Sequence, residues 1–375
     1  MTHQQILQNG ILSLIYGFFD RHLHVREKEM LRLVLPYSVR QAWGGIIMPN
    51  LMPPVTTWER AQEYRAEIYR SLPTNSVFMA IMTSYLTDNT DLQNLKEGFE
   101  RKVWHAVKFY PWGASTNSDN GVTSIEKAFP TFELMEKIGM PLLLHGELVH
   151  DKSDPLDFEK DFLERILVSE ILHRFPKLKV VLEHITTKES VNLVRSRTYK
   201  LWATIAPQYL LYSHKHLFQT GSIKDGSFKR GIRPKFWCMP IFKPDEHREA
   251  LLEAVGSEDS ERFGAGTDSA PHPYDKKYID LGCGGCLTSP YGLEMYAEGF
   301  ERAKALHLLP NFLGFNLIQD VYGLDLPGAD QLRNRPSLVR TSQFVDNDIM
   351  DDSGISVENL MGLETLKWTA ILPQG

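Results

Sequence analysis

Short runs of apolar residues alternate with longer segments of mixed character along this chain. A run of four to eight apolar residues between polar boundaries is typical of a strand that is buried on both faces. We expect eight such strands, at residues 13–20, 44–50, 77–86, 105–111, 141–147, 179–185, 201–207 and 262–268. Because helical segments separate these runs, the pattern indicates an α/β fold with a parallel sheet.

The segment 56–72, between the second and third runs, has the pattern of a crossover helix. Thr56 and Glu59 have the spacing of a capping box, and the apolar residues that follow repeat with a helical period. We therefore expect this helix to begin just after Thr56.

A second crossover helix is expected within residues 123–141. Thr123 and Glu126 repeat the capping-box spacing, and Gly139 is placed to end the helix before the next strand. Pro130 lies inside this segment. Because proline removes a backbone donor, we expect it to kink or split the helix.

Eight strands with intervening helices predict a closed (β/α)8 TIM barrel, which typically needs about 250 residues. The chain has 375 residues, and it contains no low-complexity segment, proline-rich linker or solenoid repeat. We place the surplus in an elaborated loop after strand seven, from Gln208 to Lys235, and in a short C-terminal extension of about residues 338–375. We expect one domain, with a barrel core of about residues 15–335.

Composition and charge narrow the classes of function. Hydrophobic residues make up 42% of the chain and charged residues 23%, which is typical of a soluble globular protein. The net charge of −6 offers no basic field for nucleic acid, so we expect small molecules or further copies of the chain as partners. Three cysteines cannot form a fully paired disulfide framework, which favours a reducing compartment, by default the cytoplasm.

The N-terminal region contains an apolar run from Ile11 to Phe19. It lacks the basic lead and the small-residue cleavage site of a signal peptide, so we interpret it as the approach to the first strand. No uninterrupted apolar stretch in the sequence is long enough to cross a bilayer, and we expect no membrane partner.

Polar residues close most of the apolar runs. In a TIM barrel the catalytic groups project from the carboxyl ends of the strands, so these residues are the candidates for chemistry. In chain order they are His22, His24, Arg26, Asn50, Lys108, His145, His184, Asp268 and His272. Residues i and i+2 of a strand point to the same face, so His22 and His24 can present two imidazoles to one ion.

The combination of imidazoles with a carboxylate indicates Zn²⁺ or a similar divalent metal. Four histidines and one aspartate exceed the roughly three protein ligands that one catalytic zinc takes, so two ions are implied. Two ions about 3.5–4 Å apart need a bridging anion, and Lys108 is the strand-end residue left to supply it. Burial among cations favours a neutral amine, which can add CO₂ to form a carbamate whose two oxygens could span both ions.

Each candidate also has an ordinary interpretation. His145 or His184 alone is more often a hydrogen-bonded core residue, Lys108 alone is more often solvated or ion-paired, and Asp268 alone could be a cap or turn residue. Their joint placement carries the prediction. The CGGC motif at Cys283–Cys286 lacks the second cysteine pair of a structural zinc site, and we interpret it as a glycine-rich loop near the barrel mouth rather than a redox dithiol.

Seven motifs resemble, in order, those of the type II dihydroorotases of the amidohydrolase superfamily. They are HLHVRE, MPNLMPPVTT, VKFYPWGASTNSDNGVTS, MPLLLHGE, LEHITTKES, IRPKFWCMPIFK and GTDSAPHP. The resemblance runs from about Asp20 to about Tyr322. It implies a homodimeric barrel enzyme with a binuclear zinc centre, which interconverts N-carbamoyl-L-aspartate and L-dihydroorotate in pyrimidine biosynthesis.

The resemblance also implies a role for each candidate residue. His22, His24 and Asp268 would hold one zinc ion and His145 and His184 the other, with carboxylated Lys108 between them. Asp268 would also act as the general acid and base, together with a metal-bridging hydroxide. The residues implied to contact the small anionic substrate are His24, Arg26, Asn50, Ser115, Thr116, Met239, His272 and Gly284, with Ser115 and Thr116 on a mobile lid.

Three positions depart from the family pattern without removing a ligand. Arg21 stands where an aromatic or apolar residue is common, Ser115 replaces the first lid threonine, and Tyr209 replaces a histidine. Two other functions stay open. Another binuclear amidohydrolase, such as a hydantoinase, would not need a carboxylate clamp of the kind that Arg26 and His272 suggest, and an inactive scaffold barrel would be expected to lose metal ligands.

Overall fold

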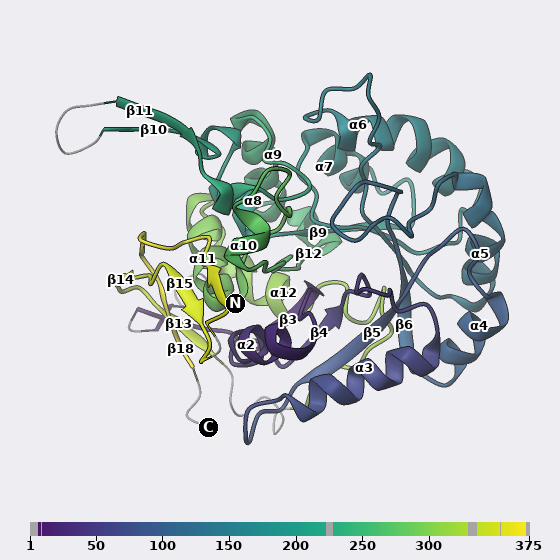
Figure 1. The fold of residues 1–375 in the computed structure, drawn as a ribbon, viewed down its shortest axis with the longest axis horizontal. Coiled ribbons are helices and arrows are strands. Elements are labelled where there is room, and N and C mark those ends of the chain that lie inside the picture. Colours follow the sequence, from purple (N-terminus) through teal and green to yellow (C-terminus); the bar gives the residue numbers. More distant parts are fainter. Residues whose placement is uncertain (1–6, 9, 223–227, 329–335, 353, 373–375) are drawn as a thin grey trace.

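The computed structural model describes residues 7–8, 10–222, 228–328, 336–352 and 354–372, and its centre is an eight-stranded sheet that curls into a barrel (Figure 1). In sheet order the strands are β12 (Phe263–Ala265), β9 (Leu201–Ile205), β8 (Val180–Leu182), β7 (Leu142–Leu144), β6 (Trp104–Phe109), β5 (Met79–Tyr85), β4 (Gly44–Ile47) and β3 (Phe19–Leu23). Every neighbouring pair is parallel. The predicted TIM barrel is confirmed.

The seam between β3 and β12 closes at the carboxyl end of β3 and just beyond β12. The backbone N–H of Asp268 donates to the carbonyl of His22 at 3.0 Å, and the N–H of His24 donates to the carbonyl of Ser269 at 3.2 Å. The buried carboxylate of Asp20 accepts the backbone N–H of Thr267 at 2.8 Å. The seam therefore brings together residues that lie at opposite ends of the barrel sequence.

The first strand lies later in the sequence than predicted. It was expected at residues 13–20, but the barrel strand is Phe19–Leu23, whereas Ile11–Ser13 forms β2 of a different sheet. The run from Ile11 to Phe19 is therefore not a simple approach to the barrel. The apolar pattern misplaced this strand because Asp20, Arg21 and His22 are buried polar residues within it.

Helices connect consecutive strands and cover the outside of the barrel (Figure 1). The α-helices of the described chain are α2 (Lys28–Val39), α3 (Trp58–Arg70), α4 (Leu92–Glu100), α5 (Ile125–Ile138), α6 (Phe158–Phe162), α7 (Lys188–Arg195), α8 (Pro207–Leu211), α9 (Asp245–Val255), α10 (Tyr274–Lys277), α11 (Gly292–Arg302) and α12 (Leu309–Gly314). A π-helical segment, Leu163–Leu172, continues α6. None of the helices in the described ranges combines the length and the apolar character needed to cross a bilayer.

The start of α3 differs in detail from the prediction. Thr57, not Thr56, is its N-cap, and the Thr57 hydroxyl accepts the backbone N–H of Arg60. The helix therefore begins one residue later than expected.

The start and the interior of α5 also differ from the prediction. Ser124 precedes the helix, and Thr123 instead donates its hydroxyl to Asp88. Gly139 ends the helix with a left-handed φ of 75°, as expected, but the helix is not split at Pro130. Sequence spacing alone did not show that Asp88, on a neighbouring loop, is the partner of Thr123.

An apolar cluster, which we call the barrel plug, joins residues of six barrel strands and their ends with the chain that follows α12. It consists of Phe19, Ile46, Met48, Ile81, Ala106, Leu143 and Val181, with Leu317, Ile318, Val321 and Tyr322 from the chain after α12. A larger apolar cluster lies between the strands and the surrounding helices. The plug leaves only the carboxyl ends of the strands for a polar site.

The surplus sequence forms two additions to the barrel. The loop predicted from Gln208 to Lys235 contains most of α8 and a hairpin of β10 (Phe218–Ser222) and β11 (Phe228–Ile232), which extends away from the barrel (Figure 1). The C-terminal extension folds beside the N-terminal segment in one antiparallel sheet. Its order is β1 (Leu7–Gln8), β2, β13 (Ser337–Val339) and β18 (Thr369–Ile371).

Two further strand pairs complete the C-terminal extension. They are β14 (Gln343–Phe344) with β17 (Thr365–Leu366), and β15 (Asp348–Met350) with β16 (Ser356–Glu358). Both pairs are antiparallel, and the backbone at Leu287, beyond β12, bridges to Asn359. The extension therefore contacts the carboxyl side of the barrel as well as its N-terminal segment.

Candidate active site

A cavity lies at the carboxyl ends of the barrel strands, and the predicted site residues converge on it. The predicted residues that line it are His22, His24, Arg26, Asn50, Ser115, Thr116, His145, His184, Met239, Asp268 and Gly284. The two other predicted residues do not line the cavity, but each has a contact near it: Lys108 with Glu183, and His272 with the lining residue Arg26. Tyr110, Ala270 and Gly285 also line the cavity and were not predicted.

His22, His24 and Asp268 form the first compact group of possible metal ligands. His22 Nε2 lies 3.1 Å from His24 Nε2 and 3.4 Å from Asp268 Oδ1. His24 Nε2 lies 3.5 Å from the same carboxylate oxygen. One donor atom from each residue lies within 4.8 Å of the others, so the three side chains could hold a single cation.

Asn50 fixes the orientation of His24. The amide oxygen of Asn50 lies 2.8 Å from His24 Nδ1. Because an amide oxygen only accepts, the proton of the imidazole must lie on Nδ1, and the lone pair of Nε2 faces Asp268. The Asn50 amide also donates to the carbonyl of Thr116 at 3.2 Å. Asn50 therefore connects the predicted lid to a predicted metal ligand.

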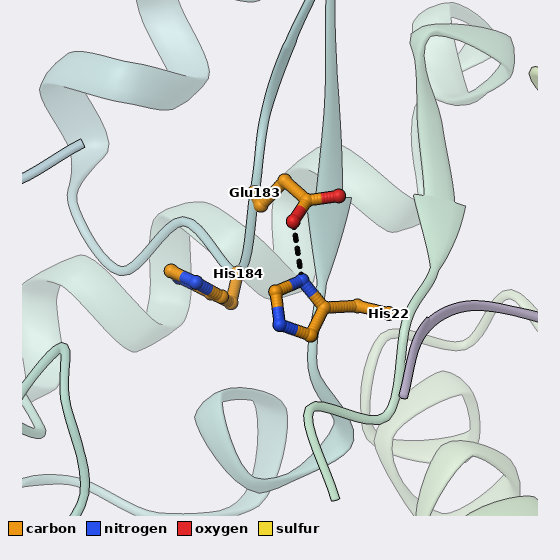
Figure 2. A group of neighbouring side chains, drawn as sticks. All are labelled: His22, Glu183 and His184. Carbon is orange, nitrogen blue, oxygen red and sulfur yellow. Dashed lines mark ion pairs between the residues drawn. The ribbon is translucent and has the colours of Figure 1, made fainter. Parts of the chain in front are cut away.

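His22, Glu183 and His184 form the second compact group (Figure 2). Glu183 and His184 are consecutive, and a left-handed φ of 40° at His184 allows both side chains to face the centre. His184 Nδ1 is buried and has no hydrogen-bond partner among the described residues. A buried imidazole nitrogen without a hydrogen-bond partner fits the donor chemistry of a metal ligand.

His145 completes the imidazole cluster but does not belong to either compact group. Its ring centroid lies 4.9 Å from that of His184. His145 Nε2 lies 2.8 Å from the Glu147 carboxylate, which leaves Nδ1 for a cation. Glu147 therefore occupies the position of a carboxylate that orients a metal-binding histidine.

Lys108, on β6, contacts a member of the second compact group. Its side chain is fully buried, and Nζ donates to Glu183 Oε2 at 2.7 Å. Burial lowers the pKa of Lys108, while the neighbouring Glu183 carboxylate acts in the opposite direction. The predicted bridging position is thus occupied by a lysine with a weakened preference for the charged form.

The electrostatic environment favours neutral imidazoles. Burial, and the nearby cations and imidazoles, lower the pKa of His22, His24 and His184 well below the usual range, so their lone pairs are available for a metal ion. Burial raises the pKa of Asp268 to about 7, against the opposing effect of Lys108. Asp268 also has a left-handed φ of 47°, and backbone strain of this kind concentrates at functional sites.

Arg26 and His272 form the side of the site predicted to bind substrate. Arg26 donates through Nε to the carbonyl of Pro271 at 3.1 Å, and its Nη2 lies 3.1 Å from His272 Nε2. Burial and the adjacent guanidinium lower the pKa of His272 to about 2, so its ring is a neutral acceptor. The guanidinium is therefore held at the cavity wall without a carboxylate partner among these contacts.

The segment around Thr116 meets the CGGC loop across the cavity. The Thr116 hydroxyl donates to the carbonyl of Gly284 at 3.2 Å. At Gly285, with a φ of 152°, an added Cβ would lie 2.4 Å from the carbonyl oxygen of Ala270. The motif lies at the barrel mouth, as the loop interpretation expects, because Gly284 and Gly285 line the cavity.

Arg21 and Tyr209, two of the three positions that depart from the family pattern, do not line the cavity. Arg21 donates to the carbonyls of Leu313 at 2.9 Å and Asn316 at 2.8 Å, so it satisfies carbonyl groups at the end of α12. The Tyr209 hydroxyl donates to the carbonyl of Pro240, next to the cavity residue Met239. Neither of these two departures removes a group from the centre.

Sequence reasoning missed Glu183 and Glu147. Both are buried, and each contacts a histidine of the centre. The signal was present, because Glu183 immediately precedes His184 and Glu147 closes the run that contains His145. At the ends of these two strands only the histidine was taken as a candidate, which overlooked the neighbouring glutamate.

Comparisons with known proteins agree with this geometry. No protein-family profile matches the sequence. The chain is 47% identical over 322 residues to the dihydroorotase of Picosynechococcus sp., which covers 86% of this chain and 88% of that protein. It is 42% identical over 351 residues to the mitochondrial dihydroorotase of Oryza sativa subsp. japonica, covering 93% and 82%.

A solved structure has the same architecture. The dihydroorotase of Saccharomyces cerevisiae, crystallised with 5-fluoroorotic acid, superimposes with a TM-score of 0.83 at 27% identity, covering 98% of this chain and 100% of that one. Because the relatives above exceed 40% identity over most of both chains, the relationship extends beyond the shape of the barrel. This chain belongs to the dihydroorotase family.

Proposed function

We propose that this protein is a dihydroorotase, which reversibly cyclises N-carbamoyl-L-aspartate to L-dihydroorotate in de novo pyrimidine biosynthesis. The observation that carries the proposal is the convergence of His22, His24, His184 and Asp268 above the buried Lys108, in a chain so similar to proteins of that name. The retained donor set argues against an inactive scaffold.

The donor set fits two divalent ions, for which we propose Zn²⁺. His22, His24 and Asp268 would hold one ion, and His145 and His184 the other. The convergent Nε2 atoms of His22 and His24 and the orphaned Nδ1 of His184 support this assignment. Bound zinc would supply a nucleophilic water at neutral pH and polarise the amide carbonyl.

Lys108 would bridge the two ions as a carbamate. The neutral amine forms an N–C bond to CO₂ and releases one proton to solvent. Burial, which lowers the pKa of Lys108, favours the reactive neutral amine. The product carries two oxygens and keeps one N–H.

Asp268 would carry the proton of the reaction. In ring opening the Asp268 carboxylate takes the two protons of the attacking water in turn, passes the first to the departing ring nitrogen and keeps the second. In ring closure the protonated carboxyl gives its proton to the leaving oxygen, then takes the proton that the attacking nitrogen loses and passes it to the same oxygen, which leaves as water. The closeness of Asp268 to His22 and His24, which would hold the ion beside it, supports this role.

Arg26 supplies the positive charge that the substrate requires. Ring closure consumes one carboxylate of carbamoyl aspartate, whereas the other remains and needs a counter-charge. We assign it to Arg26, with Asn50 and His272 beside it and main-chain groups of Met239 and Gly284. Ser115 and Thr116 would contact the substrate from the lid.

We also make proposals for the domain organisation, the assembly and the location of the protein. We propose one domain with a barrel core of about residues 15–335, a homodimeric assembly and a cytoplasmic location. Light scattering of the purified protein tests the assembly, and cell fractionation tests the location. A monomer at micromolar concentration would contradict the proposed assembly.

An activity assay with two substrates tests the function. Purified protein with added zinc is incubated with N-carbamoyl-L-aspartate, and dihydroorotate is quantified; a hydantoin is offered in parallel. We expect dihydroorotate formation and little hydantoin hydrolysis, because a hydantoin lacks the carboxylate that Arg26 recognises. Hydantoin turnover without dihydroorotate formation would establish the other amidohydrolase function, and no turnover of either would support the scaffold.

A further inference from the structure

Glu183 lies at the centre of the site, although its side chain is fully buried and sequence reasoning gave it no role. One carboxylate oxygen, Oε2, contacts both Lys108 Nζ, at 2.7 Å, and His22 Nδ1. Figure 2 shows the pair that it makes with the imidazole of His22, beside His184. A single oxygen thus connects two groups that the proposed function assigns to the metal centre.

We propose that Glu183 is a positioning residue, which fixes the tautomer of His22 and the direction of the Lys108 side chain without binding a metal ion itself. The inference rests on the proposed function, because it concerns the residues that would hold the ions.

The two ring nitrogens of His22 face different partners. Nδ1 faces Glu183, whereas Nε2 faces His24 and Asp268. A carboxylate next to Nδ1 favours the proton on that nitrogen and leaves the lone pair on Nε2. His24 Nδ1 also faces a side-chain oxygen, that of the Asn50 amide. Both histidines therefore present Nε2 to the same point.

The contact with Lys108 remains possible after carboxylation. A carbamate nitrogen keeps one N–H, which can still donate to Glu183 Oε2. If this donor stays in place, the two carbamate oxygens must point to the other side, toward the imidazoles. Glu183 would therefore decide which way the bridge faces.

Glu183 is itself held by the barrel. Its backbone N–H donates to the carbonyl of Leu144 at 3.0 Å, and the N–H of His184 donates to the Thr204 hydroxyl at 2.8 Å. The neighbouring strands thus fix the backbone on which Glu183 stands. A carboxylate on a fixed backbone can orient its neighbours more precisely than one on a loop.

Glu183 can be tested with a conservative substitution and a matched control. Glu183→Gln keeps the size of the side chain but removes its charge. It also introduces an amide donor next to Lys108 Nζ and His22 Nδ1, which are donors themselves. Glu294→Gln is the control, because Glu294 is another buried carboxylate, on α11, whose contacts are with Gln41 and with the C-terminal strands. Both variants and the wild type are loaded with zinc, stripped with a chelator, and reloaded.

Two readouts separate positioning from general stability. Nitrogen NMR of histidine-labelled protein reports the tautomer of His22, assigned with a His22→Gln variant, and chelator competition reports zinc affinity and stoichiometry. In the wild type we expect the His22 proton on Nδ1 in both loaded and stripped protein. In Glu183→Gln we expect two zinc sites with affinity reduced about 10–100-fold and a changed tautomer population, and in Glu294→Gln no change in either.

Several results would overturn the inference. A wild-type His22 protonated on Nε2 would do so even if Glu183→Gln fails to fold. Wild-type affinity and tautomer in Glu183→Gln would also do so, and the loss of exactly one zinc site would make Glu183 a ligand. Failure of the proposed function is distinguishable, because it would appear in the wild type as absent zinc binding or absent dihydroorotate formation.

Discussion

The two halves of the barrel interior are built on the same strands but have opposite chemistry. Ala106 is followed two residues later by Lys108 on β6, and Val181 is followed at the same interval by Glu183 beyond β8. On β7, Leu143 belongs to the barrel plug. Residues i and i+2 of a strand share a face, so both members of each pair lie on the same side of the sheet. Two residues along these strands, the apolar side chains of the plug therefore give way to the side chains of the polar centre.

The two halves are equally buried, so burial does not explain their difference. Leu143 and Lys108 are both 0% exposed, and Glu183 is 1% exposed. Apolar side chains gain about 1.5–3 kcal/mol each from complete burial. A buried ion pair such as Lys108 with Glu183 gains little or nothing over an apolar pair. The plug therefore stabilises the barrel, and the polar centre is retained for chemistry.

The largest expected effect comes from removing the proton carrier. Asp268→Asn keeps an oxygen that can bind metal but cannot carry a proton. We expect kcat to fall by about 10²–10⁴-fold in both directions, with zinc content close to that of the wild type. Steady-state rates together with metal analysis check this. Wild-type turnover would remove Asp268 from the mechanism.

A truncation in the barrel plug should lower the stability of the protein rather than its turnover. Leu143→Ala should lower the free energy of unfolding by about 2–5 kcal/mol, because it leaves a cavity in a packed apolar cluster. Zinc content and KM of the folded fraction should not change. His145→Ala, two residues later, is the matched variant and should lose zinc. Urea unfolding and metal analysis of both variants test whether the plug and the polar centre have separate roles. Loss of zinc in Leu143→Ala would contradict that separation.

A smaller effect is expected at the wall of the polar centre. Arg26→Ala removes the guanidinium assigned to the substrate carboxylate, and a hydrogen bond to a charged group contributes about 1.5–3 kcal/mol. We expect KM for carbamoyl aspartate to rise about 10–100-fold, and metal content to stay the same. Unchanged KM and kcat would contradict the assignment of Arg26.

The pH dependence should have opposite signs in the two directions. Ring closure needs protonated Asp268, and ring opening needs its carboxylate. Burial raises the pKa of Asp268 to about 7 in the metal-free protein, and a bound cation lowers it. Above the resulting pKa closure should slow, and below it opening should slow, each by about tenfold per pH unit. Profiles of kcat with the same slope in both directions would refute this role.

Much of this arrangement could be predicted from the sequence. Seven of the eight strands were placed correctly from their apolar runs, because each is buried on both faces. The first was misplaced because Asp20 and His22 are polar residues buried inside it. The cap at Thr57 and the Thr123 contact with Asp88 depend on tertiary contacts that a spacing rule does not contain.

The residues of the candidate site were predicted more completely than the contacts that orient them. The histidines, Arg26, Asn50, Lys108 and Asp268 were identified because they follow or close apolar runs, and their joint placement is specific. The cavity residues Ser115, Thr116, Met239 and Gly284 came only from the family resemblance. Glu183 and Glu147 were missed because a histidine stands next to or near each of them, and the histidine was taken as the functional residue. The contact of His24 with Asn50 joins residues that follow two different strands, so no local pattern shows it.

The central claim is that the polar half of the barrel interior binds two divalent metal ions with Lys108 between them. Metal analysis of purified wild type and Lys108→Ala, after dialysis against zinc without added carboxylic acids, tests it most directly. The account predicts two zinc ions per wild-type chain and a marked loss in Lys108→Ala. A wild type without stoichiometric metal, or a Lys108→Ala variant with full occupancy, would contradict it.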